Sequence, residues 1–406
     1  MRKSLDTVFN FQRKHFKEIA GIGAGEAASF AVSGVPFIGA AVGLVVKFGL
    51  EVLSDTAEIK APVLEPGKHG DFISEDAFYL ENVYRNETPI WRGIPYTQTH
   101  SFIEEIIAAK RASIRIRPSP DFFEITPFED QTLEALRDAA EAEFRAQRRI
   151  THDSDIIRLD AVSRDDDALL LDISRTKYSR QARSNLVLDF SPGGKGQSLR
   201  QALSAENFGY LPNLSDTRLA NTIGLAILIF YKDNGRLTPF FVPRTREVAI
   251  FNKGEWHCTA SGAAEWPLNP EQTPKTFQAY ILDDLFAELR EEVGLNPEDL
   301  SNILPLALCR EFARGGKPQM FFIGFTDLSH AELMDRMEKA RKITLPRAEP
   351  TEVYRMPFFR FPPKFPDAES IARSFEEKGF TSEAAANLFY ATRFLQAAEK
   401  REAQSP

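Results

Sequence analysis

Short apolar runs and alternating apolar positions mark the middle of the chain, between residues 61 and 215. Alternation at every second position is typical of a half-buried strand, and a short apolar run bounded by turn residues is typical of a buried one. On this basis we predict strands at residues 113–117, 155–162, 168–173 and 185–190.

Helical spacing of apolar positions marks two other segments. In residues 130–149 the positions that return every three or four residues are Leu133, Leu136, Ala140 and Phe144. Residues 382–402 contain no proline and show the same spacing, which predicts a helix in the C-terminal segment of residues 366–406. Because the first helix falls among the predicted strands, residues 61–215 are expected to form a mixed α/β region.

The first sixty residues differ in kind from the rest. Residues 27–46 carry no charge and are rich in alanine, glycine and valine. At about 1.5 Å per residue such a segment is long enough to cross a bilayer, yet its small residues and the break at Gly34-Val35-Pro36 make insertion marginal. We predict a hydrophobic helical hairpin over residues 1–60. The composition favours self-association through residues 19–53, giving a homo-oligomer, and leaves membrane engagement as the alternative.

Charge and cysteine content narrow the class of protein. The formal net charge of −8 and the lack of a basic stripe argue against a nucleic-acid-binding surface. Only Cys258 and Cys309 are present, which excludes a disulfide framework and fits a reducing, cytoplasmic compartment. His257 precedes Cys258, but no partner stands at zinc-site spacing, so no zinc site is predicted.

Three glutamates are concentrated in residues 287–295 (AELREEVGL). Glu288 lies four residues before Glu292 and three before Glu291, so a helix would place all three carboxylates on one side. Gly294 then fits the end of that helix. Carboxylates so placed repel one another, and a hard cation such as Mg²⁺ would compensate them. A solvated acidic face is the alternative from spacing alone.

The same nine residues resemble the second half of the Nudix box, Arg-Glu-aliphatic-any-Glu-Glu-any-Gly-aliphatic, except that Ala287 replaces the arginine. The resemblance extends to flanking segments that match an opening hairpin, the strand and turn before the box, and two later strands. These segments are residues 224–230 with 237–242, residues 256–262, and residues 304–308 with 319–325. The resemblance implies a Nudix-like α/β/α sandwich over residues 216–365.

The first half of the box is displaced. Counting back at the family spacing reaches neither the expected glycine nor the expected glutamate. We expect an insertion, with Gly262 as the box glycine, Glu265 as a stand-in for the upstream glutamate, and residues 266–274 as a proline-rich loop. In the family the missing arginine helps to hold the catalytic glutamate. With Ala287 in its place, metal binding is better supported than turnover.

The resemblance implies hydrolysis, dependent on Mg²⁺ or Mn²⁺, of a nucleoside diphosphate linked to another moiety. Glu288, Glu291 and Glu292 would be the metal ligands, and Glu288, Glu291 and Glu311 are the candidate catalytic carboxylates. The candidate substrate-binding residues are Arg244, Arg246, Trp256, Gly262, Glu265 and Lys317. The alternative is a catalytically weak module that senses a nucleotide and controls self-assembly or membrane engagement through the N-terminal hairpin. A nucleotide-type small molecule is the expected ligand in both cases.

Overall fold

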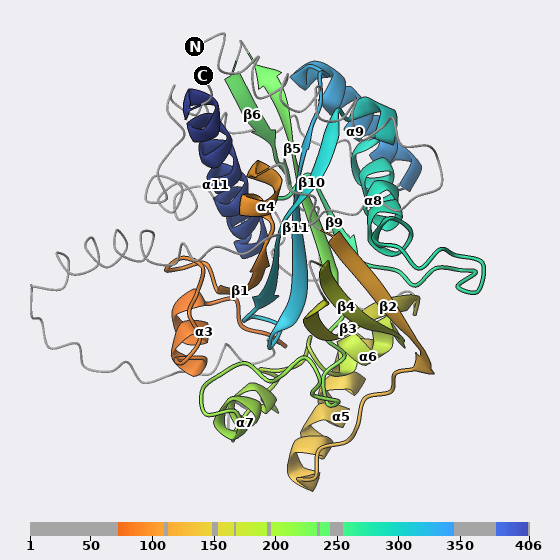
Figure 1. The fold of residues 1–406 in the computed structure, drawn as a ribbon. Coiled ribbons are helices and arrows are strands. Elements are labelled where there is room, and N and C mark those ends of the chain that lie inside the picture. Colours follow the sequence, from red (N-terminus) through yellow and green to blue (C-terminus); the bar gives the residue numbers. More distant parts are fainter. Residues whose placement is uncertain are drawn as a thin grey trace, which may run out of the picture.

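The computed structural model describes residues 72–108, 113–147, 153–165, 168–192, 196–233, 236–243, 255–344 and 379–404. The predicted hydrophobic hairpin of residues 1–60 lies outside the described residues. Among the helices in those ranges, none combines the length and apolar character needed to cross a membrane. The described chain is a mixed α/β structure in which helices flank β-sheets (Figure 1).

A six-stranded mixed sheet forms the centre of the structure. Its order is β1 (Tyr96–Ser101), β10 (Asn302–Glu311), β11 (Lys317–Phe325), β5 (Gly224–Asp233) and β6 (Arg236–Phe240), with β9 (Ala260–Ala263) also paired to β5. β11 and β5 run parallel, whereas the other neighbours are antiparallel. The first eight residues of β5 are all buried, as expected of a strand that is covered on both faces.

Helices cover both faces of this sheet. Figure 1 shows α8 (Asp283–Val293) and α9 (His330–Thr344) on one side and α4 (Ile103–Ile107) and α11 (Ser382–Gln404) on the other. Successive residues of β5 alternate between the two cores: Leu225 and Ile227 belong to the α8 side, and Ala226 and Leu228 to the α11 side. Four of the predicted strands of the Nudix-like region, at residues 224–230, 237–242, 304–308 and 319–325, correspond to β5, β6 with β7 (Val242–Pro243), β10 and β11.

A three-stranded sheet lies against the α8 side. Its order is β2 (Ser113–Phe122), β4 (Ala168–Lys177) and β3 (Asp155–Asp165). Apolar residues of all three strands belong to the same core as Leu225 and Leu289, and the Ile157 N–H donates to the Ala264 carbonyl at 2.8 Å. The region that precedes residue 216 therefore shares a hydrophobic core with the region that follows it.

The prediction of a strand at residues 185–190 is wrong. These residues form turns after α6 (Tyr178–Arg183), and Leu186, Val187 and Leu188 are buried in a separate small core. The apolar run reflects burial rather than extended pairing, a distinction that periodicity cannot make in so short a segment. The predicted strands at residues 113–117, 155–162 and 168–173 are confirmed and are longer than expected.

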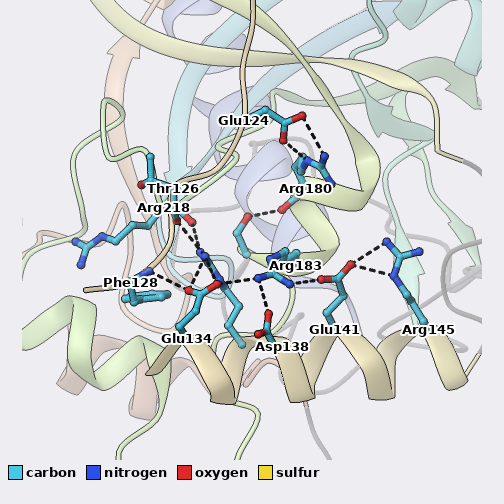
Figure 2. A network of polar contacts seen from close by, with 12 residues as sticks. Glu124, Thr126, Phe128, Glu134, Asp138, Glu141, Arg145, Arg180, Arg183 and Arg218 are labelled. Carbon is cyan, nitrogen blue, oxygen red and sulfur yellow. Dashed lines mark hydrogen bonds and ion pairs between the residues drawn. The ribbon is translucent and has the colours of Figure 1, made fainter. Parts of the chain in front are cut away.

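An ion-pair network joins α6 to α5 (Gln131–Ala146), the helix predicted over residues 130–149 (Figure 2). Arg183 lies within 2.7 Å of Glu134 and 2.5 Å of both Asp138 and Glu141. These acids fall at positions i, i+4 and i+7 of α5, so they share one face. Two further short helices in the described chain are α3 (Ala77–Val83) and α7 (Leu199–Glu206).

Candidate functional site

Helix α8 carries the glutamates of the sequence motif. It follows a π-helical turn, η3 (Gln278–Leu282), and its buried face consists of Leu285, Leu289 and Val293 at i, i+4 and i+8. Gly294 ends the helix in the left-handed conformation, with φ of 67°, and its N–H donates to the Arg290 carbonyl. The predicted helix and its glycine cap are therefore confirmed, and the cap fixes where the acidic face stops.

Strand β9 lies directly against this acidic face. An ideal Cβ built on Gly262 would stand 1.9 Å from Glu288 Oε1, so only a glycine allows this approach without moving the carboxylate. The next contacts come from main-chain donors on either side of Gly262. The Ser261 N–H donates to Glu292 Oε2 at 3.1 Å, and the Glu265 N–H donates to Asp284 Oδ2 at 3.1 Å. The structure thus brings Gly262 and Glu265 to the helix that carries Glu288 and Glu292.

The residues between β9 and η3 do not continue either element. Residues 266–274 form bends and turns, as the proline-rich sequence indicates. This segment separates Gly262 from α8 along the chain, although the two are in contact in space.

The electrostatics of this face are dominated by like charges. Burial, together with the carboxylates of Glu292, Asp284 and Glu291, raises the pKa of Glu288 to about 9. Burial also raises the pKa of Asp284 to about 6, with further increases from the charges of Glu265 and Glu291. The charges that act most strongly on Glu288 are all carboxylates, so burial and like charge both favour its protonated form.

The donor chemistry of the face suits a hard divalent cation, because every candidate ligand atom is a carboxylate oxygen. Within the described residues, however, no set of three or more histidine, cysteine, aspartate or glutamate side chains stands in an arrangement that would hold a metal ion. Glu291 is exposed and Glu292 is partly buried. Side-chain rotation on α8 would therefore be needed to gather the oxygens around one cation.

Asp284 is a member of the face that the sequence motif did not include. It lies four residues before Glu288 on α8 and accepts the Glu265 N–H. The i and i+4 spacing places Asp284 and Glu288 on one helix face, but Asp284 lies outside the sequence motif of residues 287–295.

Glu311 and Lys317 lie on the opposite face of the sheet. They are register partners at the ends of β10 and β11, and Tyr96 of β1 pairs with Glu311 on the other side. Glu311 is 1% exposed and forms an ion pair with Arg314, while its Oε2 has no hydrogen-bond partner among the described residues. Burial lowers the pKa of Lys317 to about 8 against the opposing charge of Glu311. The structure therefore separates these two residues from the acidic face of α8.

A row of polar side chains runs from Lys317 to Ser261, the residue whose N–H donates to Glu292 of α8. Lys317 Nζ donates to Gln319 Oε1 at 3.2 Å, and Gln319 Nε2 donates to Glu383 Oε1 at 3.4 Å. Glu383 Oε1 lies 3.6 Å from His257 Nε2, which is 2.6 Å from Ser261 Oγ. His257 and Glu383 were not among the predicted site residues, and only the tertiary contacts bring them to Ser261.

The remaining candidate residues do not lie together at one site. Trp256 lies in β8 (Trp256–His257), partly buried, and its main chain pairs with residues 379–381, just before α11. Two further aromatic residues that could have stacked a base, Phe240 and Phe312, are fully buried and belong to hydrophobic cores. Arg244 and Arg246 lie outside the described residues.

Comparison of the chain with known protein families and with curated protein sequences finds no match in either case.

Proposed function

We propose that this protein is a Nudix-type hydrolase that cleaves, with Mg²⁺ or Mn²⁺, the diphosphate of a nucleoside diphosphate linked to another moiety. The observation that carries the proposal is the contact between Gly262 of β9 and Glu288 of α8. In the sequence, the glycine of the box stands too far from the glutamate motif. In the fold, the loop of residues 266–274 accounts for the extra length while the glycine still meets the helix.

Each residue at the acidic face of α8 has a separate role in this proposal. The Ser261 N–H orients Glu292, and Gly262 leaves room for Glu288 beside it. A divalent cation bound by Glu288, Glu291 and Glu292 would lower the pKa of a water molecule and neutralise charge on the diphosphate. Burial and neighbouring carboxylates favour the protonated form of Glu288, so that proton would have to leave before Glu288 could bind a cation. Glu291 is exposed, so its carboxylate is accessible to take a proton from water.

A second candidate is a nucleotide-sensing module with weak turnover, which controls self-assembly or membrane engagement through residues 1–60. A specific observation favours it: Ala287 supplies no cation to the face, and the strongest charges acting on Glu288 are all negative. A carboxylate that is neutralised by a proton rather than by an arginine is less firmly oriented for catalysis.

The test is an assay of the full chain with Mg²⁺ and a panel of nucleotide sugars, dinucleotides and ADP-ribose. Glu291→Gln and Glu292→Gln variants serve as controls, because each keeps the side-chain size and removes a carboxylate. Turnover by the wild type, lost in both variants, supports the hydrolase. Tight binding of one panel member with no turnover above the variants would reject the hydrolase in favour of the sensor.

A further inference from the structure

We propose that His257 is a positioning residue for the metal site, acting through Ser261 on Glu292, and that it ties this site to the N-terminus of α11. The inference rests on the proposed function, since it concerns the orientation of a metal ligand. It adds to that function a residue from outside the Nudix-like motif.

The contacts form an unbroken path. His257 Nε2 is 2.6 Å from Ser261 Oγ, and the N–H of the same serine donates to Glu292 Oε2 at 3.1 Å. On its other side, His257 Nδ1 is 2.7 Å from Thr381 Oγ1. Thr381 immediately precedes α11, and its Oγ1 accepts the Ala384 N–H at 3.1 Å. Each ring nitrogen of His257 therefore has a hydroxyl partner that belongs to a different element.

Burial gives this path its rigidity. His257 is 3% exposed and Thr381 is 2% exposed, so their hydrogen bonds do not compete with bulk water. Ser261 lies on β9, which pairs with β5, and its hydroxyl contacts His257 while its N–H donates to Glu292, so the His257 contact anchors the strand beside this carboxylate. Loss of that anchor would let the Ser261 N–H move relative to the carboxylate that it holds.

The same contacts explain why His257 is not itself a metal ligand here. Both ring nitrogens lie within hydrogen-bond distance of hydroxyl groups, and Glu383 Oε1 is 3.6 Å from Nε2. A histidine held in this way orients its neighbours, as the outer-shell partners of metal sites commonly do.

Two substitutions at His257 separate the two hydrogen bonds. In His257→Gln the amide reaches the position of Nε2 and can bond Ser261, whichever partner donates. In His257→Asn the amide reaches the position of Nδ1 and can bond Thr381 only. Both variants remove the ring and leave a buried amide, but asparagine is shorter by one methylene and leaves more unfilled space. Ser261→Ala, which keeps the His257 ring in place, therefore separates the hydrogen bond from packing.

The readout is the affinity of the full chain for Mn²⁺ alone, measured by electron paramagnetic resonance, with thermal unfolding recorded in parallel. We expect His257→Asn to weaken Mn²⁺ binding by about tenfold and His257→Gln to retain most of the wild-type affinity. Ser261→Ala, which removes the hydroxyl and keeps the N–H, should weaken binding as His257→Asn does. It replaces the histidine variants if those do not fold.

The outcomes distinguish this inference from the proposed function. If the wild type does not bind Mn²⁺, the metal-dependent function fails and the role of His257 fails with it. If the wild type binds Mn²⁺ while His257→Asn and Ser261→Ala bind it equally well, the metal site stands and the positioning role is rejected. Equal losses in the asparagine and glutamine variants would also reject it, because glutamine keeps the hydrogen bond to Ser261.

Discussion

At the scale of single residues, the unusual feature is a glutamate whose neutral form is favoured. Glu288 lies among carboxylates on α8, and Ala287 beside it supplies no positive charge to offset them. Folding therefore favours the protonated form of Glu288. A cation and a proton compete for the same oxygens, so metal binding should release protons and weaken as the pH falls.

The first prediction concerns stability without metal. The pKa of Glu288 is raised from 4.5 to about 9 on folding, so stability is lost as the pH rises through that range. Glu288→Gln removes this loss. In EDTA, the free energy of unfolding of the variant relative to that of the wild type should therefore increase by about 1–3 kcal/mol from about pH 5 to about pH 8.5, allowing for partial solvent access. Urea unfolding at both pH values measures it. Parallel pH profiles for variant and wild type would contradict the assignment, and exposed Glu291→Gln is the control.

The second prediction concerns the bare Cα of Gly262. A methyl group there would overlap Glu288, whose Oε1 stands 1.9 Å from the ideal Cβ position, and the flexible carboxylate would have to move away. Gly262→Ala should therefore lower Mn²⁺ affinity by roughly tenfold, or about 1.4 kcal/mol. In a Glu288→Ala background the overlap is gone, so Gly262→Ala should not lower the free energy of unfolding in that background. A stability cost that persists in that background would place the strain elsewhere.

At the scale of the secondary-structure element, the end of α8 is as informative as its acidic face. Gly294 has φ of 67°, and an ideal Cβ on it would lie 2.9 Å from the Arg336 carbonyl oxygen of α9. The glycine therefore serves two purposes, since it reverses the chain and lets two helices approach.

The third prediction separates those two purposes. Gly294→Ala incurs both left-handed strain and a clash with main-chain atoms, whereas Gly93→Ala, with φ of 82° and open space around its Cβ position, incurs strain alone. We expect about 1–2 kcal/mol of destabilisation for Gly93→Ala and clearly more for Gly294→Ala, measured by urea unfolding. Equal losses would show that α9 moves away at no cost.

At the scale of the whole molecule, a buried arginine joins segments that are distant in the sequence. Arg200 of α7 is 0% exposed and donates to both carboxylate oxygens of Asp189, at 2.7 and 2.6 Å. It also donates to the carbonyls of Phe312 and Ala313 in the turn between β10 and β11, and to the Tyr84 hydroxyl after α3. This one side chain therefore couples the N-terminal half of the described chain to the central sheet.

The fourth prediction follows from the burial of that pair. Arg200→Met leaves Asp189 as a buried, partly unpaired charge and should destabilise the protein by about 3–5 kcal/mol in urea unfolding. The matched control is the exposed pair of Arg115 and Asp165, whose side chains are 53% and 54% exposed. Arg115→Ala should cost less than about 1 kcal/mol. Comparable losses at the two sites would contradict the distinction.

A fifth prediction concerns the N-terminal segment. If residues 19–53 mediate self-association, deletion of residues 1–60 should convert an oligomer into a monomer, because the apolar surface that joins the copies is removed. Light scattering of the full and truncated chains measures the mass. An unchanged mass would exclude that role for the segment.

Local patterns in the sequence predicted several helices and strands, but not β1, α3, α4 or α9. The spacing of Leu133 and Phe144 predicted α5, and the glutamate motif with Gly294 predicted α8 and its end. Residues 185–190 were misassigned, because a buried turn and a buried strand have the same apolar composition when only six residues are considered.

What the sequence determined by itself was therefore local: periodicity, caps, and the side of a helix on which three glutamates lie. Only the tertiary structure decided which residues of other elements face that side of the helix. It brought Gly262 and Ser261 to α8, added Asp284, and placed Glu311 and Lys317 on the opposite face of the sheet. The physical reason is that spacing along a helix or strand fixes directions within one element, whereas a site depends on distances between elements, which packing of the buried faces sets.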